Sequence, residues 1–373
     1  MSRNRKTKEI LIYVLVAVGI LLIVGRDAKA DFTFGTPTNL GSTVNSPDYD
    51  AGPSISSDGL SLFFYSLRPG GFGGSGWNAL DLWVAERETT ADDWGIPVDL
   101  GSTINSSTPD GHPCISSDGL SLFFDSWRPG GSGPCDMWVT TRTTFSDSWG
   151  TPVNLGPTVN SSALDMGTTI SADGLELYFG SDRTGGSGDW DIWFTTRATV
   201  LDAWVPAVNL GSTLNSPAYD GQPAISPDGL MLFFSSQRLG GYGDSDIWVT
   251  KRATRDSEWS EPVNLGPLFN TSAGEDAPSI SSDGLELYFN DYSIQRPGGV
   301  GGADLWKVPI LPVVDLNGDG IVDAEDMCIM VDHWGENYAL CDIGPMPWGD
   351  GIVDVQDLIA LAEHLFEEVP LVE

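Results

Sequence analysis

One stretch of sequence occurs five times in this chain, and the repetition constrains the fold more than any other feature. The copies share an Asp-Gly-Leu turn, as in PAISPDGLMLFFSSQRLG from Pro223. Spacings of 60, 55, 55 and 55 residues separate the turn aspartates, which are Asp58, Asp118, Asp173, Asp228 and Asp283. A fixed period of this length is typical of propellers and solenoids, in which each unit buries its apolar face against a neighbour.

Each unit contains four short segments with strand character. The second segment is apolar on both sides: in LSLFFYS, Leu62 and Phe64 face one way and Phe63 and Tyr65 the other. Such a strand is covered on both faces. Four short strands per unit, separated by Gly and Pro turns, predict one blade of a β-propeller.

The order of the segments distinguishes a closed ring from an open row of units. The first copy of segment four, FGTPTNLG from Phe34, precedes every other strand, and the last unit ends at DLWKVPILP without one. We therefore expect the N-terminal strand to complete the fifth blade and remove the free sheet edges. The sequence predicts an all-β five-bladed propeller over residues 31–312.

These repeats resemble the WD-like (WD40-like) propeller repeats of TolB-type proteins. The resemblance rests on PAISPDGLMLFFSSQR followed by DIWV, and on SxRPGGxGxxDLW followed by W..PVNLG, and it covers residues 32–312. TolB-type propellers usually have six blades, whereas this chain has five units. The resemblance implies a binding platform more often than an enzyme.

The first 30 residues are typical of a secretory signal peptide. A basic start precedes an apolar run from Ile10 to Val24, and Ala28–Ala30 has the small-x-small cleavage pattern. The run is shorter than the about 20 residues of a membrane span, and an uncleaved N-terminal anchor is the alternative. We expect a secreted, extracellular or cell-surface protein without membrane contact after signal cleavage.

The chain is strongly acidic. Eighteen Lys and Arg against 52 Asp and Glu give a net charge of −34. Such a surface repels nucleic acid and anionic lipid, so neither is an expected partner, whereas cations and neutral ligands are compatible with it. Solubility alone also explains the charge. Export permits disulfides, and pairing within each neighbourhood, Cys114 with Cys135 and Cys328 with Cys341, is expected, with free thiols as the alternative.

An acidic residue stands three positions before the first strand of every unit, the strand that lines a propeller's channel. The five are Asp50, Asp110, Asp165, Asp220 and Glu275. Ring closure predicts that these ring acids surround one mouth of the channel, where carboxylates bind cations or accept hydrogen bonds from sugar hydroxyls. The alternative is that each satisfies its own loop or pairs with a repeated arginine.

Function more often resides where the repeats differ. The first unit has an insertion in RPGGFGGSGWNALD that carries Phe72 and Trp77 on the ring-acid face. Exposed aromatic rings beside carboxylates suit carbohydrate stacking, so Trp77 joins the ring acids as a predicted ligand-binding residue. Trp127, Trp190 and His112 are also unrepeated near this face, and His112 is interpreted as a polar loop residue.

A glycoside hydrolase is the enzyme alternative. It needs two carboxylates in different environments, and the ring acids are near-copies of one another. Only Asp48 beside Asp50, and Asp276 beside Glu275, break the symmetry. We therefore assign no catalytic residue and favour a binding protein. An enzyme here would hydrolyse O-glycosyl bonds in polysaccharide catabolism, and a purely structural platform is the third interpretation.

The composition changes after Pro312, where DLNGDGIVDAED matches a twelve-residue calcium loop. The predicted Ca²⁺ ligands are Asp315, Asn317, Asp319, the carbonyl of Ile321, Asp323 and Asp326. A second copy carries Asp350, Asp354 and Asp357 at matching positions. Met346 and Trp348 occupy its first and third positions, so this second site is left open.

Two such loop-helix units resemble a type I-like dockerin, an EF-hand-related module, over residues 315–367. The resemblance implies a small all-α domain, assigned to residues 313–373, that folds on Ca²⁺ and binds a cohesin-like module of an extracellular scaffold. Ala324-Glu325 and Val355-Gln356 stand where the family often has Ser-Thr, so the cohesin is not specified. The sequence thus predicts a secreted recognition or assembly module for a carbohydrate or protein ligand, tethered through a calcium-binding dockerin.

Overall fold

The computed structural model describes residues 32–292, 296–312, 314–316, 321–336, 341, 343–344 and 352–366. The predicted signal peptide and the predicted calcium ligands Asn317, Asp319 and Asp350 lie outside the described residues. None of the helices described is both long enough and apolar enough to cross a membrane.

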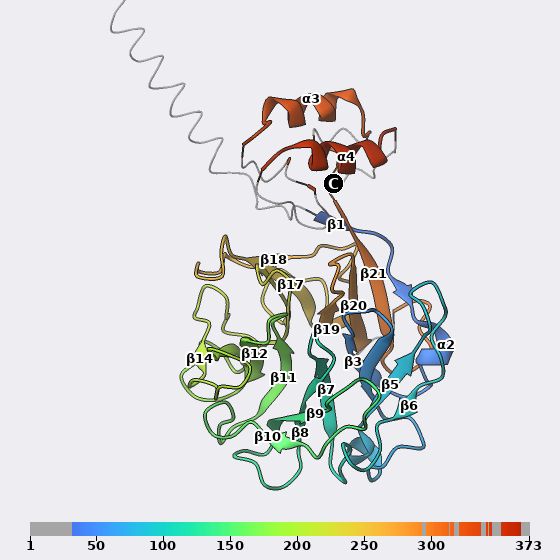
Figure 1. Cartoon of the computed structure of the whole chain (residues 1–373), viewed down its shortest axis with the longest axis vertical. Helices are drawn as coiled ribbons and strands as arrows, with labels where there is room; N and C mark the ends of the chain where they lie inside the picture. Colours follow the sequence, from blue (N-terminus) through green and yellow to red (C-terminus); the bar gives the residue numbers. More distant parts are fainter. Residues whose placement is uncertain are drawn as a thin grey trace, which may run out of the picture.

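Five antiparallel sheets form the blades of a propeller (Figure 1). Blade 1 contains β3 (Asp50–Ile55), β4 (Ser61–Ser66), β5 (Asp81–Glu86) and β6 (Val98–Asp99). Blade 2 contains β7 (Asp110–Ile115), β8 (Ser121–Ser126), β9 (Asp136–Thr141) and β10 (Val153–Asn154). Blade 3 contains β11 (Asp165–Ile170), β12 (Glu176–Ser181), β13 (Asp191–Thr196) and β14 (Val208–Asn209). Blade 4 contains β15 (Asp220–Ile225), β16 (Met231–Ser236), β17 (Asp246–Lys251) and β18 (Val263–Asn264).

The fifth blade joins the two ends of the propeller sequence. It contains β19 (Gly274–Ile280), β20 (Glu286–Tyr292) and β21 (Leu305–Pro312), with β1 (Phe32–Phe34) and β2 (Thr38–Asn39) paired to β21. Asn39 lies opposite Trp306, and Phe34 lies opposite Ile310. The inner strands β3, β7, β11, β15 and β19 contact one another in a closed cycle. The predicted five-bladed propeller and its closure by the N-terminal strand are therefore confirmed.

Apolar side chains fill the spaces between blades, as the two-sided second strand predicted. Leu62 and Phe64 of β4 pack with Tyr288 and Leu305 of blade 5, together with Trp83. Phe63, on the opposite side of β4, packs against Ile115 and Leu122 of blade 2. Each second strand therefore contributes to two inter-blade cores, which excludes water from both of its faces.

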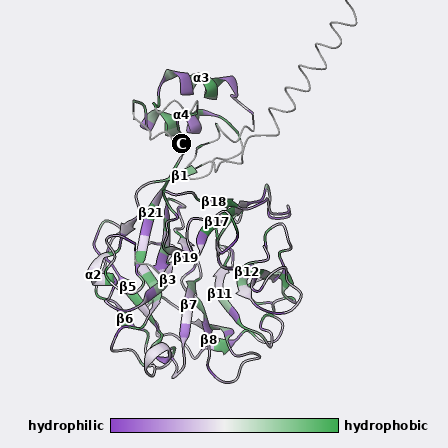
Figure 2. Cartoon of the chain, turned by 180° about the vertical axis from the view of Figure 1, so that it is seen from behind, coloured by the Kyte–Doolittle hydropathy of each residue, from purple (hydrophilic) through white to green (hydrophobic). Residues whose placement is uncertain are grey.

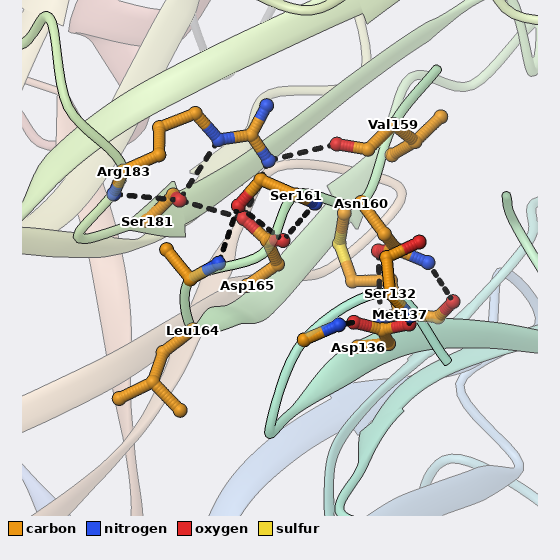
Figure 3. Close-up of polar contacts among 12 residues, drawn as sticks. Ser132, Asp136, Met137, Val159, Asn160, Ser161, Leu164, Asp165, Ser181 and Arg183 are labelled. Atoms are coloured by element: carbon orange, nitrogen blue, oxygen red, sulfur yellow. Dashed lines mark hydrogen bonds and ion pairs between the residues drawn. The ribbon is translucent and has the colours of Figure 1, made fainter. Parts of the chain in front are cut away.

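Two repeated polar contacts tie each blade to the preceding one. The backbone N–H of every ring acid donates to a carbonyl of the preceding blade, at 2.9 to 3.1 Å. A buried asparagine five residues before each ring acid both accepts from and donates to one backbone position of that blade. In blade 3, Asn160 accepts from the N–H of Met137 at 2.9 Å and donates to its carbonyl at 3.0 Å (Figure 3). The full set is Asn45, Asn105, Asn160, Asn215 and Asn270.

Short helices complete the described structure. α2 (Gly41–Val44) follows β2, and the 3-10 helix η1 (Gly76–Ala79) lies in the blade 1 insertion. The C-terminal region contains α3 (Ala324–Asp332) and α4 (Val355–Glu363), which carry both hydrophilic and hydrophobic segments (Figure 2). Their apolar sides share a small core that includes Val322, Met330, Val353 and Leu361.

The C-terminal helices lie at the end of the propeller opposite the ring acids. A cavity of about 700 Å³ separates Ala360 and His364 of the α4 region from the Asp-Gly turns of blades 1 and 5. These turns join the far ends of the inner strands to the second strands. The C-terminal region therefore leaves the ring-acid end of the channel uncovered.

The cysteines differ from the expected pairing. All four lie within the described part of the chain and are free thiols. Cys114 and Cys135 are buried in blade 2, Cys341 is buried in the C-terminal core, and Cys328 is exposed on α3. The proposed Cys114–Cys135 and Cys328–Cys341 bridges are not formed, which leaves the alternative of free thiols.

The asparagine contacts predict a stability effect. Replacing Asn160 by Ala removes two buried hydrogen bonds and leaves the N–H and C=O of Met137 unsatisfied. We expect a loss of about 2–4 kcal/mol in the free energy of unfolding, measured by urea denaturation. The exposed Asn78→Ala variant is the control and should stay within about 0.5 kcal/mol of the unsubstituted protein. Equal midpoints for the two variants would contradict this role.

Candidate functional site

The ring acids stand at one end of the channel, but their carboxylates turn into their own blades. All five are fully buried. In blade 3, the Asp165 carboxylate accepts hydrogen bonds from the backbone N–H of Ser161 at 2.5 Å and from the Ser181 hydroxyl at 2.6 Å (Figure 3). Arg183 forms an ion pair with the same carboxylate and also donates to the carbonyl of Val159.

The other blades repeat this arrangement. Ion pairs join Arg68 to Asp50, Arg128 to Asp110 and Arg238 to Asp220 at 2.5 to 2.7 Å. The structure thus favours the alternative in which each ring acid satisfies its loop and a repeated arginine. Internal donors already occupy the carboxylates of all five ring acids, so these carboxylates are not available to bind a ligand at the channel mouth. The five are Asp50, Asp110, Asp165, Asp220 and Glu275.

The second set of repeated aspartates holds a glycine-rich loop. Asp136 accepts from the backbone N–H groups of Ser132 and Gly133, and from the side chain of Asn154 at 2.9 Å. A Cβ added at Gly131 would lie 2.0 Å from an Asp136 oxygen, so the Pro-Gly-Gly motif needs its second glycine. The repeated arginines therefore pair with the ring acids, and the repeated aspartates with backbone.

Glu275 departs from the other ring acids because its side chain is longer. Arg296 Nη2 lies 3.3 Å from Glu275 Oε1, farther than in the other blades. Burial raises the pKa of Glu275 to about 7, although hydrogen bonds from Thr271 and the charge of Arg296 oppose the shift. Glu275 is thus a buried carboxyl group that gains or loses its proton near neutral pH.

A kink in every inner strand opens the channel mouth to unrepeated side chains. The pairing of each first and second strand shifts register just after the ring acid. The residue two positions after each ring acid has a positive φ, and these residues are Gly52, His112, Gly167, Gln222 and Ala277. Left-handed backbone is uncommon outside glycine, and such positions gather at functional sites. His112 and Gln222 are therefore placed at the mouth at a cost in backbone strain.

His112 is the centre of a hydrogen-bonded cluster from three blades. Its Nδ1 lies 2.7 Å from Asp125 Oδ2, and its Nε2 lies 3.2 Å from the Tyr65 hydroxyl and 3.0 Å from Gln222 Nε2. Burial alone would lower the pKa of His112, but the carboxylates of Asp125 and Asp276 raise it above its usual value. His112, interpreted from sequence as a polar loop residue, instead joins blades 1, 2 and 4.

Asp276 of blade 5 adds a second carboxylate to this mouth. Burial raises its pKa, while the Ser235 hydroxyl, the charge of His112 and the N–H of Ala277 oppose the shift. Its Oδ1 is buried and has no hydrogen-bond partner among the described residues. By contrast, Asp125 accepts from His112 and from the N–H of Gly167 at 3.0 Å. The two carboxylates therefore occupy different environments.

Aromatic rings connect the mouth to the outer surface. Trp77, 64% exposed on η1, contacts Tyr49 with a ring separation of 5.5 Å. Tyr49 stacks on Tyr65 at 6.1 Å, and Tyr65 contacts the His112 ring at 4.7 Å. The structure thus connects the predicted Trp77 to the His112 cluster rather than to the ring acids. Elsewhere at this end of the propeller, the rings of Trp190 and Tyr219 stack with their centroids 6.0 Å apart.

The predicted calcium ligands are described only in part. Asp323 is the N-cap of α3 and accepts from the N–H of Glu325, as Asp354 does from Gln356 at the start of α4. Asp326 is buried and accepts from the N–H of Leu316 and of Asp323. Asp357 occupies the matching position in the second unit. Within the described ranges, no group of three or more His, Cys, Asp or Glu could hold a metal, so the calcium site stays a prediction.

Asp125, Tyr65, Tyr49 and Gln222 were not among the residues predicted from sequence. Asp125 and Tyr65 occupy one position of the repeat, which reads Tyr65, Asp125, Gly180, Ser235 and Asn290 around the ring. His112 and Gln222 likewise share a position that differs between blades. A position-by-position comparison of the five units would have identified this mouth.

Comparison with known proteins yields the fold alone. No protein-family model matches the chain, and no curated protein matches its sequence. Among solved structures, a putative TolB from Agrobacterium tumefaciens has 18% identity and a TM-score of 0.43, covering 76% of this chain and 86% of its own. A GH43 endo-arabinanase from Bacillus licheniformis has 15% identity and a TM-score of 0.48, covering 72% and 95%. An alpha-L-arabinofuranosidase from Lactobacillus brevis has 13% identity and a TM-score of 0.48, covering 73% and 94%.

The environment of Glu275 predicts a pH-dependent stability. Because burial raises its pKa to about 7 in the folded protein, the protonated form stabilises the fold at low pH. That stability is lost as the pH rises through 7, by about 1.4 kcal/mol between pH 6 and pH 8. Glu275→Gln should remove this share of the pH dependence in urea unfolding, whereas the exposed Glu258→Gln should retain it. An unchanged dependence in Glu275→Gln would contradict the assignment.

Proposed function

We propose that this propeller is a secreted recognition module that binds a polysaccharide at the mouth formed by Tyr65, His112, Asp125, Gln222 and Asp276. One observation carries the proposal: the positions at which the five blades differ converge on this end of the channel. Positions that only build a ring have no reason to diverge from blade to blade. Divergent polar and aromatic side chains at one mouth are the expected sign of an asymmetric ligand.

The side chains of the mouth suit a carbohydrate. Tyr65, Gln222 and His112 provide hydrogen-bond donors and acceptors, and Asp276 provides an acceptor. Trp77 on the blade 1 insertion offers an exposed ring surface that is connected to Tyr65 through Tyr49. Flat aromatic surfaces next to convergent polar groups match the alternating apolar faces and hydroxyl edges of sugar rings. The net charge of −34 disfavours anionic polysaccharides.

A hydrolase acting on O-glycosyl bonds is the second candidate, favoured by one observation. Asp125 accepts from the ring of His112 and from backbone, whereas Asp276 has a raised pKa and a buried oxygen without a partner among the described residues. Two carboxyl groups in different environments are what acid–base hydrolysis requires. Release of reducing sugar, abolished by Asp276→Asn and by Asp125→Asn, would favour this candidate over binding alone.

We further propose that the C-terminal region is a calcium-loaded dockerin that tethers the propeller to a cohesin-like scaffold module. The support is the calcium-loop pattern from Asp315 to Asp326 and two helices with matching aspartate capping boxes. This region lies at the end of the propeller opposite the mouth. A tether there leaves the mouth free for ligand.

A binding site at the mouth predicts which substitutions weaken polysaccharide binding. Trp77→Ala and His112→Ala should each weaken the polysaccharide bound by the full chain about tenfold or more, since 1.4 kcal/mol corresponds to tenfold. The measurement is affinity electrophoresis against xylan, arabinan, β-glucan, galactan and chitosan, followed by calorimetry on the best oligosaccharide. Phe145→Ala, an exposed aromatic at the opposite end, is the control. Equal losses in all three variants, or none, would argue against a site at the mouth.

The calcium loop predicts metal-dependent order in the C-terminal region. Calorimetric titration of the chelated full chain should show Ca²⁺ binding, with protection of residues after Pro312 from proteolysis, because the ligands must fold around the ion. Asp315→Ala should weaken binding about a hundredfold, equivalent to about 2.7 kcal/mol. The exposed Asp332→Asn is the charge-matched control. Absence of both heat and protection in the unsubstituted protein would reject the assignment.

A further inference from the structure

The buried carboxylate of Asp276 points to the chemical class of the ligand. Its Oδ1 has no hydrogen-bond partner in the described part of the chain. The Ser235 hydroxyl and the backbone N–H of Ala277 lie close enough to lower the pKa of this carboxyl group, although the Ala277 N–H donates to Ser235 Oγ at 3.1 Å. A buried acceptor without a donor costs free energy unless a ligand or water satisfies it. Asp276 as a whole is partly exposed, although Oδ1 itself is buried.

Several tyrosines lie within electrostatic reach of this carboxylate. Asp276 is near enough to four tyrosines to raise the pKa of each, although burial is the larger cause; they are Tyr49, Tyr65, Tyr219 and Tyr292. All four therefore remain neutral and cannot balance its charge. Neutral phenol rings provide electron-rich faces and hydroxyl oxygens beside a carboxylate, an arrangement that attracts a cation.

The charges of the mouth leave an excess of negative charge. Among the described residues, His112 is the cationic group whose charge acts on Asp276, and His112 is itself bound to Asp125 at 2.7 Å. Asp291 of blade 5 is fully buried, and both of its carboxylate oxygens already accept from backbone N–H groups, of Arg296 and of Asp304. The nearby repeated arginines are each paired with a ring acid. Even with His112 protonated, the carboxylates of this mouth outnumber its free cations.

We propose that Asp276 binds the ammonium group of an amino-sugar residue, so that the ligand is a polysaccharide bearing free primary amines. This inference rests on the proposed function and names its ligand class. The ammonium group would donate to the unpartnered Asp276 Oδ1 and lie against the tyrosine rings. The exposed Trp77, which contacts the partly exposed Tyr49, provides stacking surface for the neighbouring sugar rings. That surface favours an amino sugar over a lysine side chain.

The same geometry implies how binding depends on pH. As the pH falls, Asp276 gains a proton and loses its negative charge, and His112 gains a positive charge. Both changes weaken the electrostatic attraction of the mouth for a cation. Tyr49, Tyr65, Tyr219 and Tyr292 stay neutral, and the hydrogen-bonded Asp125 keeps its bond to His112. Affinity for the amine should therefore rise as the pH increases, until the ligand loses its own proton.

The test compares three oligosaccharides of equal length with the full chain by calorimetry: a glucosamine hexamer, an N-acetylglucosamine hexamer and cellohexaose. At pH 6.5 we expect the amine-bearing hexamer to bind at least tenfold more tightly than the other two. Asp276→Asn should remove that preference, while Asp276→Glu, which keeps the charge, should retain part of it. The exposed Asp93→Asn makes the same change in net charge elsewhere and should alter nothing. It thereby separates the site from general attraction to an acidic protein.

The outcomes distinguish this inference from the proposed function. If the neutral hexamers bind equally well and Asp276→Asn changes nothing, the ammonium assignment is overturned, while binding at the mouth still stands through Trp77→Ala and His112→Ala. If a lysine-rich peptide binds and no amino sugar does, the ligand class is wrong. If no oligosaccharide or polysaccharide binds at all, both proposals fail. A thermal unfolding curve of each variant excludes loss of fold as the cause.

Discussion

The junction at the start of each inner strand is the contact on which the remaining structure depends. There the ring acid donates its backbone N–H to the preceding blade, and its carboxylate binds an arginine of its own blade. In blades 1, 3 and 4 the carboxylate also accepts from a serine hydroxyl. The nearby asparagine adds two hydrogen bonds to the preceding blade. Because these contacts use backbone from one blade and side chains from the next, no blade completes its own hydrogen bonding. The blades are stable as a ring rather than singly.

This junction also explains why variation is confined to the mouth. The repeated acid, arginine and asparagine hold the ring together, so these positions keep the same chemical character in all five blades, with Glu275 in place of Asp in blade 5. The residues at the kink make none of these contacts between blades. At these positions the side chains differ between blades, and His112, Gln222 and Asp276 lie there. An asymmetric site is thus built on a nearly symmetric frame.

The sequence predicted the blades, their number and the closing strand, because period and segment order determine strand pairing directly. It did not predict which way a carboxylate turns. Asp50 and Asp81 are both repeated, and spacing alone does not tell which of them pairs with Arg68; the structure selects Asp50. The mouth was missed for a related reason: Asp125 and His112 are thirteen residues apart but meet only through the kink. Part of the calcium loop lies outside the described residues, so that prediction awaits its metal titration.

Strand β21 has a consequence for a tethered protein. It pairs with both β20 and the N-terminal β1, and the chain continues from its end toward α3 and α4. If a scaffold holds the C-terminal region while a bulky, anchored polymer is held at the mouth, tension between them passes along β21. Pulling in that direction slides the strand past its two partners and loads its hydrogen bonds together rather than one by one. The strand that closes the propeller would also be its mechanical link to whatever carries it.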